Sequence, residues 1–229
     1  ENEEELSPKE NLKDIIFSNH IQGVLENQIY IDKSNLLPKE QSYLKRLASF
    51  TNPKFYELQK LRMTIFCGTT PRIISCFEEN EKYLTLPRGC IDKIRDICKS
   101  SKVKLMLTDK REIGSTTDYS FIGELNEKQE KAKRQLLLHD MGVLSAATGF
   151  GKTVISAKII SELKTNVLII VNRTNLLQQW REKLPYFLGI PKKEIGQMGG
   201  GKEKLNGKLD IASFQSLYKK ENLNQIVKD

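Results

Sequence analysis

The chain has 229 residues, of which 38% are hydrophobic and 29% charged, and this balance is typical of a soluble protein with one or two domains. Its longest apolar stretches, such as Val167–Val171, are far shorter than the roughly 18 residues that a membrane-spanning helix needs, and no signal-peptide pattern opens the sequence, so we expect a cytoplasmic protein without membrane contacts. The formal charge is +8, and residues 121–229 hold 18 Lys and Arg against 11 Asp and Glu, which suits a polyanionic partner.

The first part of the chain predicts a small α+β domain. Residues 1–27 are acidic at the start and read as a leader that is partly disordered or helical. Residues 28–112 form the predicted accessory domain. A strand is expected at 29–31, and a helix from Pro38 whose apolar face holds Tyr43, Leu44, Leu47 and Phe50. There follow a second helical pattern through Phe55, Leu58 and Leu61, a hairpin of strands 72–77 and 83–86, a helix near 91–98 and a strand at 103–107.

A linker is predicted at residues 113–123, and the pattern beyond it alternates between helix and strand. Helices are expected at 126–138, 152–163 and 174–187 and from Phe214 onward, with strands at 143–147, 167–171 and 209–213. Such alternation predicts an α/β domain with a parallel sheet wrapped by helices, in which ligands bind at the carboxyl ends of the strands.

The most specific motif is the small-residue stretch that ends in Gly-Lys-Thr after the expected strand 143–147. Backbone amides of Thr148, Gly149, Phe150 and Gly151 can surround phosphate oxygens, Lys152 adds a cation, and Thr153 offers a hydroxyl to nucleotide-bound Mg²⁺. The helix that follows directs its positive end to the same anion. The alternative is an incidental glycine-rich turn between a strand and a helix.

This loop resembles a motif of superfamily 2 helicases. Those proteins commonly have A-x-T-G-x-G-K-T, which Ala146–Thr153 matches in place of the fuller pattern with Gly at the first position. Seventeen residues before Ala146 lies Gln129, where such helicases have a glutamine that pairs with adenine. A solvated glutamine is the alternative at this position.

Two further segments resemble helicase motifs in the same order. The stretch from Leu168 to Trp180 is similar to a strand that ends in Arg and leads into a Leu-Leu-x-Gln-Trp helix. The resemblance implies that Arg173 contacts a nucleic-acid strand and that Thr174 caps a helix whose amides face a phosphate. The stretch from Asp210 to Leu217 also resembles a helicase motif, which implies that Ser213 and Gln215 contact a nucleic-acid strand. Helix capping by Ser213 is the alternative. The alternative for Arg173 is a surface ion pair. For Trp180 we favour a position in the core over base stacking. The segment Gly199–Gly201 is interpreted as a mobile turn.

Together these motifs cover about residues 121–220 and are similar to the first motor domain of superfamily 2 helicases, nearest to the xeroderma-pigmentosum-B and type III restriction branch. The resemblance implies a RecA-like domain at residues 124–229, the cofactors ATP and Mg²⁺, a nucleic-acid partner with DNA favoured, and a second RecA-like domain elsewhere in the parent chain. It also implies a role in DNA repair or mobile-element defence. The segments Phe55–Gln59 and Leu86–Gly89 look more weakly like bacterial helicases of primase-linked conflict systems.

The sequence contains no Asp-Glu dipeptide, although helicases of this kind use one to hold Mg²⁺ and orient water. We therefore expect the chain to be the amino-terminal part of a longer enzyme and to be inactive alone, with catalytic residues Lys152 and Thr153 awaiting the rest of the site. Two alternatives remain open. One is a P-loop kinase-like phosphotransferase, and the other is a non-catalytic DNA-binding module.

Overall fold

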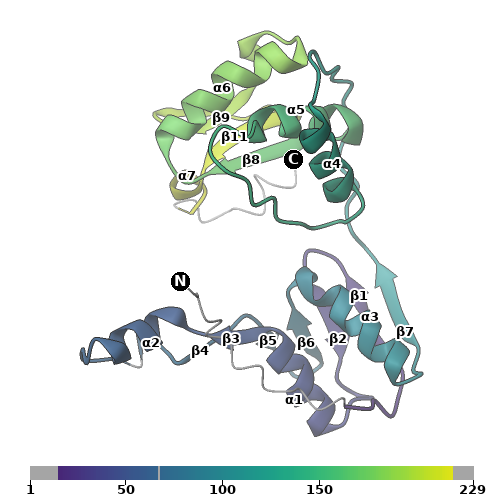
Figure 1. Cartoon of the computed structure of the whole chain (residues 1–229). Helices are drawn as coiled ribbons and strands as arrows, with labels where there is room; N and C mark the ends of the chain where they lie inside the picture. The colour runs from purple at the N-terminus through teal and green to yellow at the C-terminus, as the bar shows by residue number, and fades with distance from the viewer. Residues whose placement is uncertain (1–14, 67, 219–229) are drawn as a thin grey trace. The chain divides into compact units, whose positions relative to one another are not determined.

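The computed structural model describes residues 15–66 and 68–218, and the first fourteen residues of the expected leader lie outside this range. The chain divides into two compact units, residues 1–112 and residues 113–229 (Figure 1). Among the described residues, no helix is long and apolar enough to cross a membrane.

The first unit is built on a five-stranded mixed sheet with the strand order β5-β6-β2-β1-β7. Strand β1 pairs antiparallel with β2 and parallel with β7, while β6 pairs antiparallel with β2 and β5. The strands are β1 (Ile21–Leu25), β2 (Ile29–Asp32), β5 (Glu78–Glu79), β6 (Tyr83–Leu86) and β7 (Leu105–Asp109). Helices α1 (Pro38–Leu47) and α3 (Ile91–Ser100) complete this part of the fold.

One hydrophobic core joins these elements. It includes Ile21 and Ile31 from the sheet, Leu44 from α1 and Ile94 from α3, each with 0% exposure. The spacing Ile94, Ile97 and Cys98 places three buried side chains on one face of α3, which is why this helix packs on the sheet. Burial of these apolar faces supplies the main stabilisation of the unit.

Three expectations for the first unit are wrong. Residues 15–27 are not a leader, since β1 lies inside the sheet and Phe17 is buried in the core. The predicted hairpin of 72–77 with 83–86 does not form, because β4 (Ile73–Ser75) pairs with β3 (Ser49–Thr51) and β6 pairs with β2 and β5. Phe50 is not on the apolar face of α1, because it belongs to β3 and is 53% exposed.

The paired strands β3 and β4 form the base of an extension, described residues 49–66 and 68–75, which we call the arm. Helix α2 (Pro53–Lys60) lies at its far end, away from α1 and β6 (Figure 1). The side chain of Asn52 fixes the arm: its Oδ1 accepts a hydrogen bond from the Lys54 amide at 3.1 Å and its Nδ2 donates to the Pro71 carbonyl at 2.8 Å. Asn52 is buried, so the arm is an ordered structure although α2 buries no side chain.

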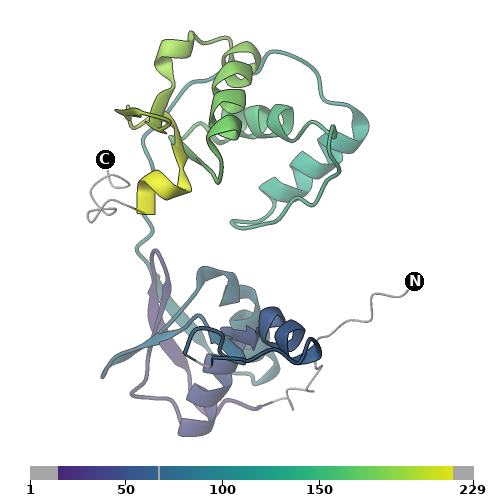
Figure 2. The same ribbon diagram turned by 90° about the vertical axis from the view of Figure 1, so that its left-hand side faces the viewer.

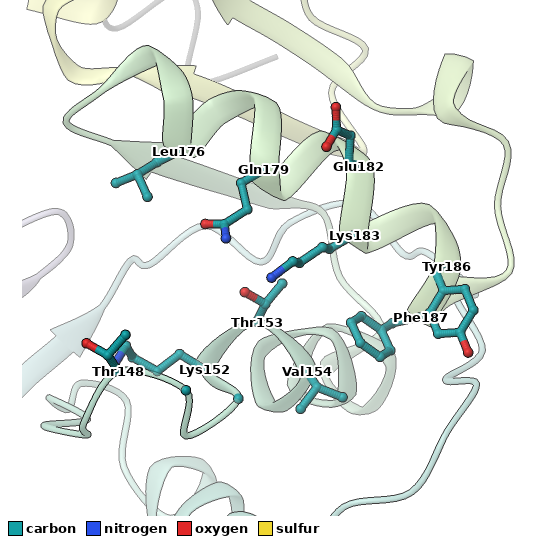
Figure 3. A pocket seen from close by; sticks show the side chains of 12 residues that line it. Thr148, Lys152, Thr153, Val154, Leu176, Gln179, Glu182, Lys183, Tyr186 and Phe187 are labelled. Carbon is teal, nitrogen blue, oxygen red and sulfur yellow. The ribbon is translucent and has the colours of Figure 1, made fainter.

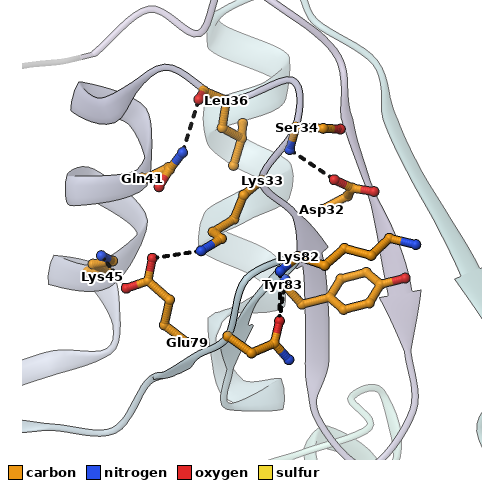
Figure 4. Close-up of polar contacts among 10 residues, drawn as sticks. Asp32, Lys33, Ser34, Leu36, Gln41, Lys45, Glu79, Lys82 and Tyr83 are labelled. Carbon is orange, nitrogen blue, oxygen red and sulfur yellow. Dashed lines mark hydrogen bonds and ion pairs between the residues drawn. The ribbon is translucent and has the colours of Figure 1, made fainter.

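Acidic side chains connect the segments of the first unit. Glu79 on β5 forms ion pairs with Lys33 and Lys45, which links the sheet to α1 (Figure 4). The hydrogen bonds that the two lysines donate in these ion pairs lower the pKa of Glu79, and the one from Lys45 has the larger effect. Glu40 is fully buried in α1, and its carboxylate accepts hydrogen bonds from the amides of Ser18 and Leu37, both at 2.8 Å.

Glu40→Ala should destabilise the first unit by about 2–4 kcal/mol, because it removes two hydrogen bonds to a carboxylate and leaves two amides without their acceptor. Hydrogen exchange of the β2 amides reports this loss within the unit. Glu57→Ala, at an exposed position of α2, is the control and should change the exchange free energy by less than about 0.5 kcal/mol. Similar values for the two variants would show that Glu40 has no such role.

The second unit contains a four-stranded sheet with the order β10-β9-β11-β8. Strand β11 (Leu209–Ser213) lies parallel to both β8 (Val167–Val171) and β9 (Gly196–Gly199), while β10 (Lys202–Lys204) is antiparallel to β9. Helices α5 (Lys152–Leu163) and α6 (Thr174–Leu188) pack against each other (Figure 2). Ile160, Leu177, Leu184 and Ile211 meet in a core against which Trp180 is partly buried, in the position favoured from the sequence.

The segment 143–147 is not a strand, contrary to expectation. Val143 is 93% exposed, and this segment pairs with no strand within the described residues. An apolar run adopts strand geometry only when a neighbouring strand supplies hydrogen bonds. Strand β8 likewise pairs only with β11 in the described part of the chain and leaves Ile170 54% exposed, so it is less covered than its continuous apolar sequence predicts.

Residues of the predicted linker pack on the second unit. Thr116 bridges to Thr165, the Thr117 amide donates to the Lys164 carbonyl, and the Ile122 amide donates to the Phe187 carbonyl at 2.7 Å. The Phe121 ring stacks on that of Phe187. The segment therefore contributes hydrophobic side chains to this unit.

Candidate functional site

The phosphate loop reaches helix α5 through two glycines in the left-handed region of the backbone. Gly149 has φ +84° and Gly151, at the N-cap of α5, has φ +92°. Residues that carry a side chain rarely adopt these φ angles, which explains why glycine occupies both positions. No atom would contact a Cβ at Gly149 within 4 Å, so the loop is open there to close approach by a ligand. The start of α5 at Gly151 suits an anion, although the Phe150 amide here donates to the Ala147 carbonyl at 3.3 Å.

Lys152 is folded back on the loop. Its Nζ donates hydrogen bonds to the carbonyls of Ala146 at 2.6 Å and Ala147 at 3.0 Å, and its side chain is exposed. Neutral carbonyls are weaker partners for an ammonium group than phosphate oxygens are. A nucleotide phosphate can therefore draw Lys152 away from these carbonyls. Thr153 follows it in the first turn of α5 and is half-buried.

Gln129 lies against the phosphate loop although 21 residues separate it from Phe150. Helix α4 (Glu127–Leu137) begins with a capping box, in which Gln129 Oε1 accepts from the Asn126 amide at 3.0 Å and Asn126 Oδ1 accepts from the Gln129 amide at 2.9 Å. Gln129 Nε2 donates to the Phe150 carbonyl at 2.8 Å. Its carboxamide thus supports the loop, and one N–H and one lone pair remain, so adenine contact stays a prediction.

A buried lysine connects α4 with α5. Lys133, 7% exposed, forms ion pairs with Glu130 at 2.7 Å and Glu162 at 2.8 Å, and Lys158 also pairs with Glu162. The hydrogen bonds from Lys133 lower the pKa of both glutamates, and the same contacts, that with Glu130 first, raise the pKa of Lys133. The cluster holds the helix of Gln129 against the helix of Lys152.

The lowered pKa of Glu162 predicts a pH dependence. A carboxyl group with a depressed folded-state pKa stabilises the fold above its unfolded pKa, and this contribution is lost as the pH falls through the folded pKa. Acidification below the ordinary value of 4.5 should therefore destabilise the second unit more steeply in the wild type than in Glu162→Gln. Urea unfolding followed by the fluorescence of Trp180, the only tryptophan, measures this. Glu124→Gln, at an exposed position, is the control; equal pH slopes for all three proteins would contradict the expectation.

A pocket of about 700 Å³ extends from the phosphate loop along α6. Gln179 and Lys183 point from α6 toward the first turn of α5, where Thr153 faces them (Figure 3). Tyr186, 73% exposed, borders the far end. These α6 residues were not predicted as site residues. Their spacing of three to four positions, on the helix face away from buried Leu177 and Leu184, is the signal that could have indicated them.

The residues that the sequence predicts to contact a nucleic-acid strand lie at the carboxyl edge of the β-sheet. Ser213 of β11 is in register with Val171 of β8, so α6 and α7 (Phe214–Tyr218) both begin at this edge. Gln215 Nε2 donates to the Asn172 carbonyl at 2.8 Å and thereby joins the two helix starts. Arg173 and Thr174 are exposed beside them. The structure thus gathers these four residues at one edge.

Three details differ from the sequence interpretation of this edge. Arg173, not Thr174, occupies the N-cap position of α6, because its extended backbone (φ −140°) places the helix start at Thr174. Ser213 caps α7, since its Oγ accepts from the Ser216 amide at 3.2 Å, so the capping alternative is observed. Gly199, interpreted as part of a turn, instead ends β9 and pairs with Lys202, so that Gly200 and Gly201 alone form the turn of the β9–β10 hairpin; Gln197 Nε2 donates to the Gly199 carbonyl at 2.8 Å.

The parallel strands β8, β9 and β11 with helices α5 and α6 form an α/β domain of the RecA-like class, and comparison with known proteins specifies the class further. Residues 122–229 match the family described as type III restriction enzyme, res subunit. Over 95 residues the chain is 33% identical to the DNA 3'-5' translocase XPB2 of Sulfurisphaera tokodaii, a match that covers 42% of the chain and 21% of that protein. It is 31% identical over 93 residues to the putative helicase 109L of invertebrate iridescent virus 3, which covers 39% of the chain and 28% of that protein.

Among solved structures, the UvsW helicase of bacteriophage T4 has a similar fold, with a TM-score of 0.62, 19% identity, and coverage of 89% of this chain and 78% of that one. Over these matched residues the chain is similar to superfamily 2 helicases, so the predicted resemblance and the α/β fold class with its RecA-like sheet are confirmed. The matched stretches span between a fifth and a third of the length of the two curated relatives. The resemblance to primase-linked helicases stays a prediction.

Proposed function

We propose that the chain is part of an ATP-dependent DNA helicase or translocase that acts in the cytoplasm in DNA repair or mobile-element defence. The phosphates of ATP bind at residues 148–153, Lys152 contacts them, and Thr153 supports a Mg²⁺ ion that the nucleotide brings. When bound, Mg²⁺ neutralises phosphate charge. Gln129 supports the loop and contacts adenine through its remaining N–H and lone pair.

Helix α6 is the observation that best supports this proposal. Its start, at Arg173 and Thr174, lies at the sheet edge with Ser213 and Gln215, while its later turns line the pocket next to the phosphate loop. A helix moves as a rigid element, so a change at the nucleotide can alter the position of the strand-contacting edge. This is the coupling that a translocase needs. A kinase that phosphorylates a small molecule does not need a second surface that contacts nucleic acid at the sheet edge.

We further propose that residues 124–229 act with a second RecA-like domain, and that residues 1–112 are an accessory domain. A second domain would supply arginines that stabilise charge on the transferred phosphoryl group. The 229-residue chain by itself should then bind ATP weakly and hydrolyse it negligibly.

Steady-state ATP hydrolysis tests this function. A protein extended to include a second motor domain should hydrolyse ATP faster when single-stranded DNA is added, and Lys152→Ala should abolish this activity. The 229-residue chain should show no Lys152-dependent turnover. Transfer of phosphate to a small-molecule acceptor, without stimulation by DNA, would instead identify a kinase-like enzyme and refute the proposal.

A further inference from the structure

We propose that the arm, residues 49–66 and 68–75, is a second nucleic-acid-binding surface that contacts unpaired bases. The phosphate loop and the sheet edge do not involve this segment. Its sequence and structure combine an ordered backbone, exposed apolar side chains and a local excess of positive charge. The proposal goes beyond the motor function, because it assigns a ligand class to the first unit.

Exposed apolar side chains concentrate on the arm. Five of the seven large hydrophobic side chains that are exposed among described residues 15–112 belong to it: Phe50 (53%), Leu61 (61%), Met63 (56%), Phe66 (70%) and Ile73 (54%). Single exposed apolar residues are ordinary on protein surfaces, but such a concentration marks an interaction site. The core of the unit, centred on the five-stranded sheet, does not include any of these five.

The arm also carries the positive charge of the first unit. It holds Lys54, Lys60, Arg62 and Arg72 against the single acid Glu57, whereas the rest of residues 1–112 has 15 Lys and Arg against 16 Asp and Glu. Lys54, Lys60 and Arg62 are exposed. A cationic surface on an otherwise nearly neutral unit favours a polyanion over an apolar protein partner.

The geometry of the arm keeps these groups in place. Three residue pairs between β3 and β4 form its base, and the Asn52 contacts with Lys54 and Pro71 close it above the strands. Arg72 Nε donates to the Tyr56 hydroxyl at 3.0 Å, which ties α2 to the returning chain. These contacts support the apolar tip of the arm, by which we mean the exposed side chains of Leu61, Met63 and Phe66 between α2 and β4.

Unpaired bases are the nucleic-acid feature that fits such a tip. Aromatic and apolar side chains stack on the faces of exposed bases or insert between base steps, while Lys and Arg follow the phosphates. In a duplex the base faces are covered by stacking, and an apolar side chain enters only by unstacking a base step at a cost of about a few kcal/mol, so mainly the cations would engage a duplex. We therefore assign the arm to single-stranded or forked nucleic acid.

Binding of labelled single-stranded DNA and blunt duplex DNA to the full 229-residue chain tests the assignment. The double variant Leu61→Ala with Phe66→Ala should weaken single-strand binding about tenfold and change duplex binding much less. The double variant Lys54→Glu with Lys60→Glu should weaken binding to both ligands. It should also reduce the dependence of log affinity on log salt by about 0.7 for each cation that contacts a single strand.

Matched controls separate the arm from general surface effects. Ile16→Ala with Leu37→Ala removes exposed apolar groups outside the arm, and Lys93→Glu with Lys99→Glu reverses charges on α3. Lys152→Ala separates the arm from the motor, because failure of nucleotide binding would leave arm binding intact. Circular dichroism and the melting temperature check the fold of each variant.

The inference is overturned if the arm variants bind both DNA ligands as well as their controls do. It is also overturned if the arm variants leave DNA binding unchanged but abolish self-association in sedimentation, because the apolar tip would then dock on another copy of the chain. If one double variant fails to fold, the single variants Phe66→Ala and Lys60→Glu replace it and carry the same expectations in direction.

Discussion

Lys152→Ala should lower the affinity of the chain for Mg-ATP roughly 10- to 100-fold, because hydrogen bonds between an ammonium group and phosphate oxygens contribute about 1.5–3 kcal/mol. In the structure the Lys152 side chain is exposed, and its Nζ donates to the carbonyls of Ala146 and Ala147. Its removal should therefore cost little stability. Calorimetric titration measures the affinity, and the melting temperature without nucleotide measures the stability.

Lys131→Ala is the matched control for this result. Lys131 is an exposed lysine of α4 that does not line the pocket, so its loss changes the net charge equally without touching the loop. Affinity for Mg-ATP should stay within about twofold of the wild type in this control. If both variants bind Mg-ATP alike, the loop is not the phosphate site.

Gly151→Ala should impair the loop by two routes. Its φ of +92° disfavours a side chain, and a Cβ there would lie 2.5 Å from Gln129 Nε2, so the hydrogen bond from Gln129 to the Phe150 carbonyl must shift. We expect a loss of about 1–3 kcal/mol in the stability of the second unit. We also expect Mg-ATP affinity to fall at least about tenfold, since the amides of the loop lose their arrangement. Trp180 fluorescence and calorimetry report the two effects.

Gly149→Ala provides the comparison that separates these routes. Gly149 has a similar φ of +84°, but its Cβ would meet no atom within 4 Å. The difference in stability between the two variants therefore measures the contacts of a Cβ at Gly151, with Gln129 Nε2 at 2.5 Å and with Val154 Cγ1 at 3.1 Å. Adding Gln129→Ala to each should reduce the effect of Gly151→Ala and leave that of Gly149→Ala unchanged. Additive effects in both pairs would show that Gln129 does not support the loop.

Elements with a strong local pattern were predictable from the sequence. The helix 152–163 and the strands 167–171 and 209–213 are found with the expected bounds, because their apolar residues repeat over their full length. Partner choice was not predictable. Strand β4 pairs with β3, a three-residue strand with little signal of its own, and β9 contains two glycines yet is fully buried between β10 and β11. Such pairings depend on contacts distant in sequence.

The candidate site shows the same division between local and tertiary information. The loop at 148–153 follows from its own residues, whereas the contact of Gln129 with Phe150 was not visible in spacing alone. The burial of Lys133 was also not predicted, because it depends on ion pairs with Glu130 on the same helix and with Glu162 on α5. The failure of segment 143–147 to form a strand has the same cause, since a neighbouring strand decides it.

In the proposed motor, nucleotide phosphates bind at the loop next to α5, and α6 connects this site to the sheet edge. Amide NMR spectra of the 229-residue chain during titration with Mg-ATP measure both effects in one experiment. We predict the largest shifts at residues 148–153 and smaller shifts along α6 as far as Arg173, with much smaller shifts in Lys152→Ala at the same Mg-ATP concentration. Shifts confined to other regions, or equal shifts in Lys152→Ala, would contradict the claim.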